Sequence, residues 1–187
     1  PYFDKDQEGN LAVEHYEGDQ YPPDVPVTDY RTFRLEDKKP DAVFIHNPYD
    51  QNNRLTSVHP DFYSSRLKKY ADQLVYLPYY TTASTGNVES AERQARSTGF
   101  VMEPGAVNAD CIVTATEQER EFFINILCSW IKGVQAEQWE EKVQYFGSPK
   151  IERARDTKRQ DGSLPEKWQE CLYSPDGSRK KTVFYGL

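Results

Sequence analysis

The sequence predicts an α/β fold in which a mostly parallel sheet is covered by helices on both faces, the three-layer arrangement of Rossmann-like domains. Two segments, Ala42–Ile45 and Gln73–Leu77, have the composition of strands that are buried on both faces, because 42–45 and 74–77 are unbroken apolar runs. Between them, Pro60 begins a segment with helical spacing. Strands that alternate with helices are typical of parallel sheets, and we expect a right-handed crossover between these two strands.

A second strand and helix are predicted at 110–133. Thr116 and Glu119 match the S/T-x-x-E capping box that begins a helix. Apolar side chains then repeat with helical spacing at Phe122, Phe123, Ile126, Leu127, Trp130 and Ile131. We expect this helix to end near Gly133, a further helical piece to run through Trp139, and a third strand to occupy 143–146.

The rest of the chain predicts shorter elements. In chain order these are a strand at 12–16, a helix within 28–39 that is capped by Thr28 or Asp29 and ends before Pro40, a charged surface segment or linker at 150–163, a helix at 165–172, and a turn at 174–177 that leads into a last strand. The polar stretch at 81–100 is either a functional loop or a mobile one.

Composition argues against several classes of protein. The chain has 187 residues, of which 28% are charged, 37% hydrophobic and 13% aromatic, so it is globular rather than disordered. Its formal net charge of −7 argues against a general nucleic-acid-binding protein. The three cysteines are widely spaced, which favours reduced thiols in a cytoplasmic protein, and no C-x-x-C metal spacing occurs. No apolar run approaches the roughly 20 residues that span a bilayer.

Polar side chains gather directly after the first apolar run. His46, Asn47 and Asp50 follow the predicted end of that strand, which is where ligands bind in open α/β sheets. His46 is a candidate general base or anion contact, because imidazole titrates near neutral pH. The alternative is that His46 and Asn47 bond to nearby backbone, as polar residues in turns do.

Two further residues belong to the candidate site. His59 either meets the same ligand as His46 or is the N-cap of the helix that begins near Pro60. Arg54 is either a phosphate clamp, through its planar guanidinium, or a solvated loop residue. The sequence has no glycine-rich phosphate loop and no G-x-S-x-G motif, and we expect neither a metal nor a cofactor.

Four segments carry a resemblance to a known family. They are Phe44-Ile-His-Asn-Pro-Tyr-Asp50, Thr56-Ser-Val-His-Pro-Asp-Phe-Tyr63, Leu74-Val-Tyr-Leu-Pro-Tyr79 and Phe146-Gly-Ser-Pro-Lys150. Together they resemble bacterial proteins of the CDP-glycerol glycerophosphotransferase-like family, which is related to the teichoic acid polymerases. The resemblance spans most of residues 14–187.

This resemblance implies a GT-B fold, in which two Rossmann-like lobes face a cleft. The N-terminal lobe would meet the acceptor and the C-terminal lobe would hold the CDP-glycerol donor. Residues 1–150 would be the acceptor-side lobe without its opening strand and helix. Residues 151–187 would be a linker, a short helix and the first strand of a truncated second lobe. On this interpretation the chain is a fragment that is inactive by itself.

The resemblance also implies a function in the biosynthesis of a cell-surface polymer, such as a teichoic acid or a capsule-like polymer. Glycerol phosphate from CDP-glycerol, or a sugar from a nucleotide sugar, would pass to a polymer or lipid-linked acceptor. His46 would be catalytic, and Asn47, Asp50, Arg54 and His59 would contact substrate.

The partners implied are a nucleotide-activated donor and that acceptor, without nucleic acid. A peripheral association of the full-length protein with the membrane stays open. Two other functions stay open as well. One is a non-catalytic Rossmann-like binding module, and the other is a GT-B-like sugar-nucleotide epimerase.

Overall fold

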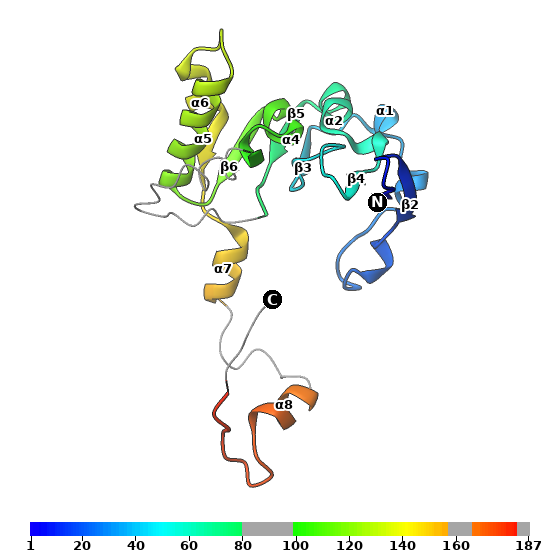
Figure 1. The fold of residues 1–187 in the computed structure, drawn as a ribbon, viewed down its shortest axis with the longest axis vertical. Coiled ribbons are helices and arrows are strands. Elements are labelled where there is room, and N and C mark those ends of the chain that lie inside the picture. The colour runs from blue at the N-terminus through cyan, green and yellow to red at the C-terminus, as the bar shows by residue number, and fades with distance from the viewer. Residues whose placement is uncertain (80–98, 157–165, 183–187) are drawn as a thin grey trace. The chain divides into compact units, whose positions relative to one another are not determined.

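The chain divides into two compact units, Pro1–Ser148 and Pro149–Leu187. A computed structural model describes residues 1–79, 99–156 and 166–182 (Figure 1). Nearly all of the polar stretch at 81–100, and most of the expected last strand, lie outside the described residues.

Four strands of the larger unit form one parallel sheet. In chain order they are β3 (Ala42–Ile45), β5 (Gln73–Tyr76), β6 (Cys111–Thr114) and β7 (Val143–Tyr145). They pair in that same order, and each is parallel to its neighbour. Helices flank the sheet, which is consistent with a Rossmann-like three-layer fold. The predicted α/β fold class is confirmed.

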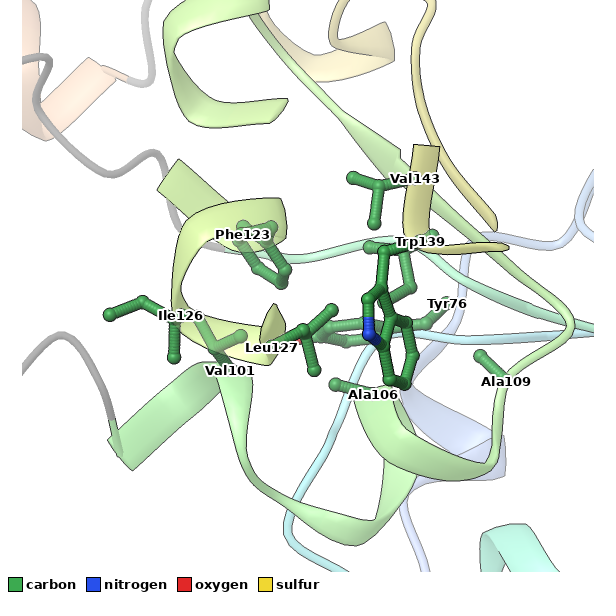
Figure 2. Packing of buried hydrophobic residues seen from close by; sticks show 10 residues of the cluster. Tyr76, Val101, Ala106, Ala109, Phe123, Ile126, Leu127, Trp139 and Val143 are labelled. Carbon is green, nitrogen blue, oxygen red and sulfur yellow. The ribbon is translucent and has the colours of Figure 1, made fainter. Parts of the chain in front are cut away.

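Helices between consecutive strands bury the apolar side chains of the sheet. Their bounds are α2 (Ser64–Tyr70), α4 (Pro104–Asn108), α5 (Glu117–Trp130) and α6 (Ala136–Lys142). Figure 2 shows Phe123 and Leu127 of α5 in the main core with Tyr76 and Val143 of the strands. A smaller cluster joins Leu67 of α2 to Leu74 of β5, so the expected unit of strand, helix and strand is present.

The first two strands are not buried on both faces, so that prediction is wrong. Within the described residues β3 pairs only with β5 and is an edge strand, and the Phe44 side chain is 64% exposed. In β5, Leu74 and Tyr76 are fully buried, whereas Gln73 is exposed. An apolar run has the same composition in a central strand and in an edge strand, because its place in the sheet depends on which strands pair.

A second, antiparallel sheet is built mainly from the start of the chain. Its strands are β1 (Tyr2–Lys5), β2 (Leu11–His15) and β4 (Thr56–Val58), in the order β2-β1-β4. β2 confirms the strand expected at 12–16. β1 and β4 were not expected, because strands this short carry little periodicity and exist through their pairing. β4 ties the segment between β3 and α2 to the start of the chain.

Two of the predicted helices are divided into shorter pieces. The helix expected within 28–39 consists of η2 (Tyr30–Thr32) and α1 (Leu35–Lys38), because the intervening Phe33 and Arg34 have extended backbone. Asp29 caps the first piece, and the second ends before Pro40, as expected. The helix expected from Pro60 likewise consists of η3 (Pro60–Phe62) and α2. One more short turn, η1 (Gly18–Gln20), follows β2.

The N-cap of α5 by Thr116, which is one half of the predicted capping box, is confirmed. The Thr116 hydroxyl accepts a hydrogen bond of 3.2 Å from the Glu119 N–H, and the Glu119 carboxylate accepts one of 2.8 Å from the Ala115 N–H. The helix ends at Trp130, earlier than expected, because Ile131 already has extended backbone.

The smaller unit contains α7 (Pro149–Asp156) and α8 (Glu166–Leu172), which have no buried residues. The part of the charged stretch that the structure describes, up to Asp156, is therefore on the surface, as expected, and it is helical. The Gly177 N–H donates to the Ser174 carbonyl at 2.9 Å, which confirms the turn. None of the described helices is long and apolar enough to cross a membrane. The second GT-B lobe stays a prediction.

Candidate functional site

His46 and Asn47 lie directly after β3, at the carboxyl end of the parallel sheet. Both side chains are exposed, and the His46 ring meets the Tyr79 ring edge-on with 6.2 Å between ring centroids. The Asn47 side-chain oxygen accepts a hydrogen bond of 2.9 Å from the Tyr49 N–H. This bond is the local turn contact that polar residues at strand ends form, and it leaves the Asn47 amide NH₂ as a donor.

Asp50 is held in the protein interior and caps a helix. Its backbone is left-handed, with φ 47°, and only 4% of the residue is exposed. The carboxylate accepts the Ser64 N–H at 2.9 and 3.0 Å and the Ser64 hydroxyl at 2.6 Å. Burial raises the pKa of Asp50, and the hydrogen bonds from Ser64 oppose that rise. Asp50 therefore joins the loop after β3 to the first turn of α2.

A glycine fixes the same loop from another side. The Gly105 N–H at the start of α4 donates to the Pro48 carbonyl at 2.7 Å. A Cβ at position 105 would lie 2.7 Å from the Pro48 Cα, which no side chain tolerates without movement of the backbone. The loop that carries His46 and Asn47 is thus attached to both α2 and α4.

His59 serves as the N-cap of η3, one of the two roles considered for it. Its Nδ1 accepts a hydrogen bond of 3.2 Å from the Asp61 N–H. The ring packs against Phe3, Tyr30 and Phe62, with centroid distances of 5.4, 5.3 and 5.9 Å, and the side chain is 18% exposed.

Two cavities border the candidate site, and His46 and His59 line different ones. The larger has a volume of about 870 Å³, and His46, Asn47 and Asp50 are among the residues that line it. The smaller, of about 590 Å³, is lined in part by His59. Arg54 is exposed and lines neither of these two cavities.

Two tyrosines extend the site beyond the residues that the sequence singled out. Tyr49 follows the strand-end loop, and Tyr79 follows β5, so both lie after carboxyl ends of neighbouring strands. Burial raises the pKa of Tyr49 to about 12, with further contributions from Tyr79 and Glu103. Tyr79 thus contacts both His46 and Tyr49. The sequence contained a signal that could have identified Tyr79, since Pro78 and Tyr79 directly follow a predicted strand just as His46 and Asn47 do.

No group of three or more His, Cys, Asp or Glu side chains that would hold a metal ion occurs in the described part of the chain. Comparisons of the chain with protein-family models, curated proteins and solved structures found no match.

Proposed function

We propose that this chain is the acceptor-binding part of a transferase that builds a cell-surface polymer. The observation that carries the proposal is the cavity of about 870 Å³ at the carboxyl end of β3, with His46 and Asn47 in its wall. Ligands bind at this end of the strands in open α/β sheets. The resemblance to CDP-glycerol glycerophosphotransferase-like proteins supplies the reaction class.

In the proposed reaction, His46 accepts the proton of an acceptor hydroxyl group. The acceptor oxygen then forms a bond to the phosphorus of the glycerol phosphate group, and the bond from that phosphorus to the CMP oxygen breaks. CMP leaves with the negative charge. Asn47 donates from its amide NH₂ to the acceptor, because its side-chain oxygen is already bonded to Tyr49. Transfer of a sugar from a nucleotide sugar would use the same base.

The proposal places the protein in the cytoplasm, where nucleotide-activated donors are available. A polymer or lipid-linked acceptor would bring the full-length protein to the inner face of the membrane. Most contacts to the donor would come from a second lobe, so we expect the present chain to catalyse no transfer when it is assayed alone.

The test is a transfer assay on the full-length protein with CDP-glycerol and, in parallel, UDP-sugars. We expect His46→Ala to lower the rate about 100-fold or more, because a general base contributes about that much. The matched control is His15→Ala, since His15 stacks on Tyr2 and bonds to Asp4 in the antiparallel sheet. An unchanged transfer rate in the His46→Ala variant would show that His46 is not the catalytic base. Formation of an isomerised UDP-sugar would point to an epimerase.

A second candidate function has its own support in the structure. Asn47, Asp50 and His59 all bond to nearby backbone, as residues with a purely structural role would. This pattern favours a Rossmann-like module that binds a ligand without turnover. Absence of transfer and of epimerisation by the full-length wild-type protein with every donor would support the binding module over the transferase.

A further inference from the structure

The larger cavity differs from a phosphate site in the charge of its lining. As the described residues form it, no lysine or arginine side chain lines it, and its acidic side chains are Glu17 and Asp50. Sites for phosphate groups are normally built from Arg, Lys or helix N-termini, which supply positive charge. Of these two residues only Glu17 is exposed, since the Asp50 carboxylate is buried and bonded to Ser64, so a negatively charged group in this cavity would meet a carboxylate and no basic side chain.

Aromatic rings supply much of the cavity wall. Two of them are open to solvent, since Phe44 is 64% exposed and Tyr21 is 57% exposed. They come from different segments, Phe44 from edge strand β3 and Tyr21 from the stretch after η1. Flat rings that face a cavity offer a surface for the apolar face of a ligand ring.

The basic side chains of this region line the smaller cavity. Arg31, Arg34 and Arg66 line it together with His59. Each arginine is paired with a carboxylate, Arg31 with Asp29 at 2.9 Å, Arg34 with Asp37 at 3.2 Å, and Arg66 with Glu36 at 2.5 Å. Tyr30 and Phe62 line both cavities, so a common wall divides the basic cavity from the aromatic one.

We propose that the larger cavity binds an uncharged saccharide. Its ring stacks on Phe44 and Tyr21, and its hydroxyl groups meet His46 and Asn47. The identification of this saccharide as the end of the acceptor rests on the proposed function, whereas its binding to the cavity does not. The substrate class is therefore an acceptor with a neutral sugar at its end, rather than one that presents a phosphate group to this cavity.

The test uses the 187-residue chain on a glycan array that carries neutral, phosphorylated, sulfated and carboxylated saccharides. We expect binding to neutral glycans. The best neutral glycan is then titrated against wild type, Phe44→Ala and Tyr21→Ala. Each variant should bind about tenfold more weakly, the loss that one stacked ring produces.

The matched control is Leu55→Ala, because Leu55 is 76% exposed and lies outside the lining of this cavity. It should bind like wild type, and circular dichroism of each variant verifies folding. Binding only to anionic glycans, or to none, would overturn the inference. Equal binding by Phe44→Ala, Tyr21→Ala and wild type would place the sugar elsewhere and overturn it too.

The outcome separates this inference from the proposed function. If the His46 variant loses transfer and the chain binds no glycan, the proposed transferase function is supported and the proposed saccharide site is wrong. If neutral glycan binding depends on Phe44 but the full-length protein transfers nothing, the saccharide site is supported and the proposed transferase function is wrong.

Discussion

Asp50 has a structural role in the candidate site, which follows from its hydrogen bonds. Its carboxylate is buried and accepts three hydrogen bonds from Ser64, and Asn108 in turn donates to the Ser64 hydroxyl at 2.8 Å. A carboxylate at the N-terminus of a helix satisfies free N–H groups and interacts favourably with the helix dipole. Asp50 thus fixes the shape of the cavity wall, whether or not it also meets a ligand.

Asp50→Ala should therefore lower the free energy of unfolding by about 1–2 kcal/mol, while Asp50→Asn, which keeps one acceptor oxygen, should cost less. Urea denaturation measures both. Asp19→Ala, at an exposed position in η1, is the control and should change nothing. Equal stability of Asp50→Ala and wild type would contradict the capping role.

The pH dependence of the same residue has a defined sign. The folded protein raises the pKa of Asp50 above 3.8, so just above that pH the native state holds a proton that the unfolded chain has lost. Stability should fall as pH rises from 3.8 through the raised pKa, and Asp50→Ala should lack this component of the fall.

Lys142 is a partly buried ionisable residue away from the candidate site. Its Nζ donates to the Val107 carbonyl at 2.7 Å and lies over the Trp139 ring at 5.2 Å. Burial and the charge of the neighbouring Lys68 lower the pKa of Lys142, Asp110 opposes them, and the net result is a pKa of about 8.

Between about pH 8 and 10.5 the unfolded chain keeps a proton that the folded Lys142 has released, so stability should rise with pH across this window. The shift of the Lys142 pKa from 10.5 to about 8 corresponds to a component of about 3 kcal/mol. Lys142→Met should flatten the rise in urea denaturation at a series of pH values. Lys132→Met, at an exposed lysine, should keep the wild-type slope. The same slope in both variants would refute the assignment to Lys142.

At the scale of elements, α5 shows how local signals specify a helix. Thr116 and the repeat of apolar side chains predicted its start and part of its buried face: Phe123 and Leu127 are fully buried, whereas Trp130 is 65% exposed. These signals lie within a few residues of one another, so they act before any distant contact forms.

Thr116→Ala should lower the free energy of unfolding by about 1 kcal/mol, because the Glu119 N–H loses its acceptor. Thr116→Ser keeps the hydroxyl and should stay within a few tenths of wild type. Thermal and urea unfolding, followed by circular dichroism, compare the two. A loss of equal size in the serine variant would show that the methyl group, rather than the cap, stabilises the helix.

Other elements depend on distant contacts. The run at 42–45 predicted a strand correctly and its burial wrongly, because β3 lies at the edge of the sheet as the described residues form it, and Phe44 is 64% exposed. β1 and β4 were not predicted, because each of these short strands is defined by its partners in the antiparallel sheet.

At the scale of the whole molecule, the hydrophobic core belongs to the larger unit. Every buried hydrophobic residue that the structure describes lies between Leu35 and Val143. The smaller unit, from Pro149, contains α7 and α8 without buried residues. The two units therefore contribute very unequally to stability.

A chain that ends at Ser148 should fold with nearly the same urea midpoint as the 187-residue chain. It should also keep its amide NMR shifts in the parallel sheet, because none of the core side chains that the structure describes is removed. A large drop in the midpoint, or broad changes of shift in β5 and β6, would show that the larger unit needs residues after Ser148.

The sequence by itself determined the order and type of the main elements, the α/β class, the start of α5 and the place of His46 and Asn47 after a strand. These depend on periodicity, caps and strand ends, which are local. Only the tertiary structure decided that β3 is an edge strand among the residues it describes, that Asp50 bonds to Ser64, and that His46 and His59 line different cavities. Each of those features depends on contacts between residues that are far apart in the chain. Such contacts form through hydrophobic burial and strand pairing, which involve the whole folded molecule.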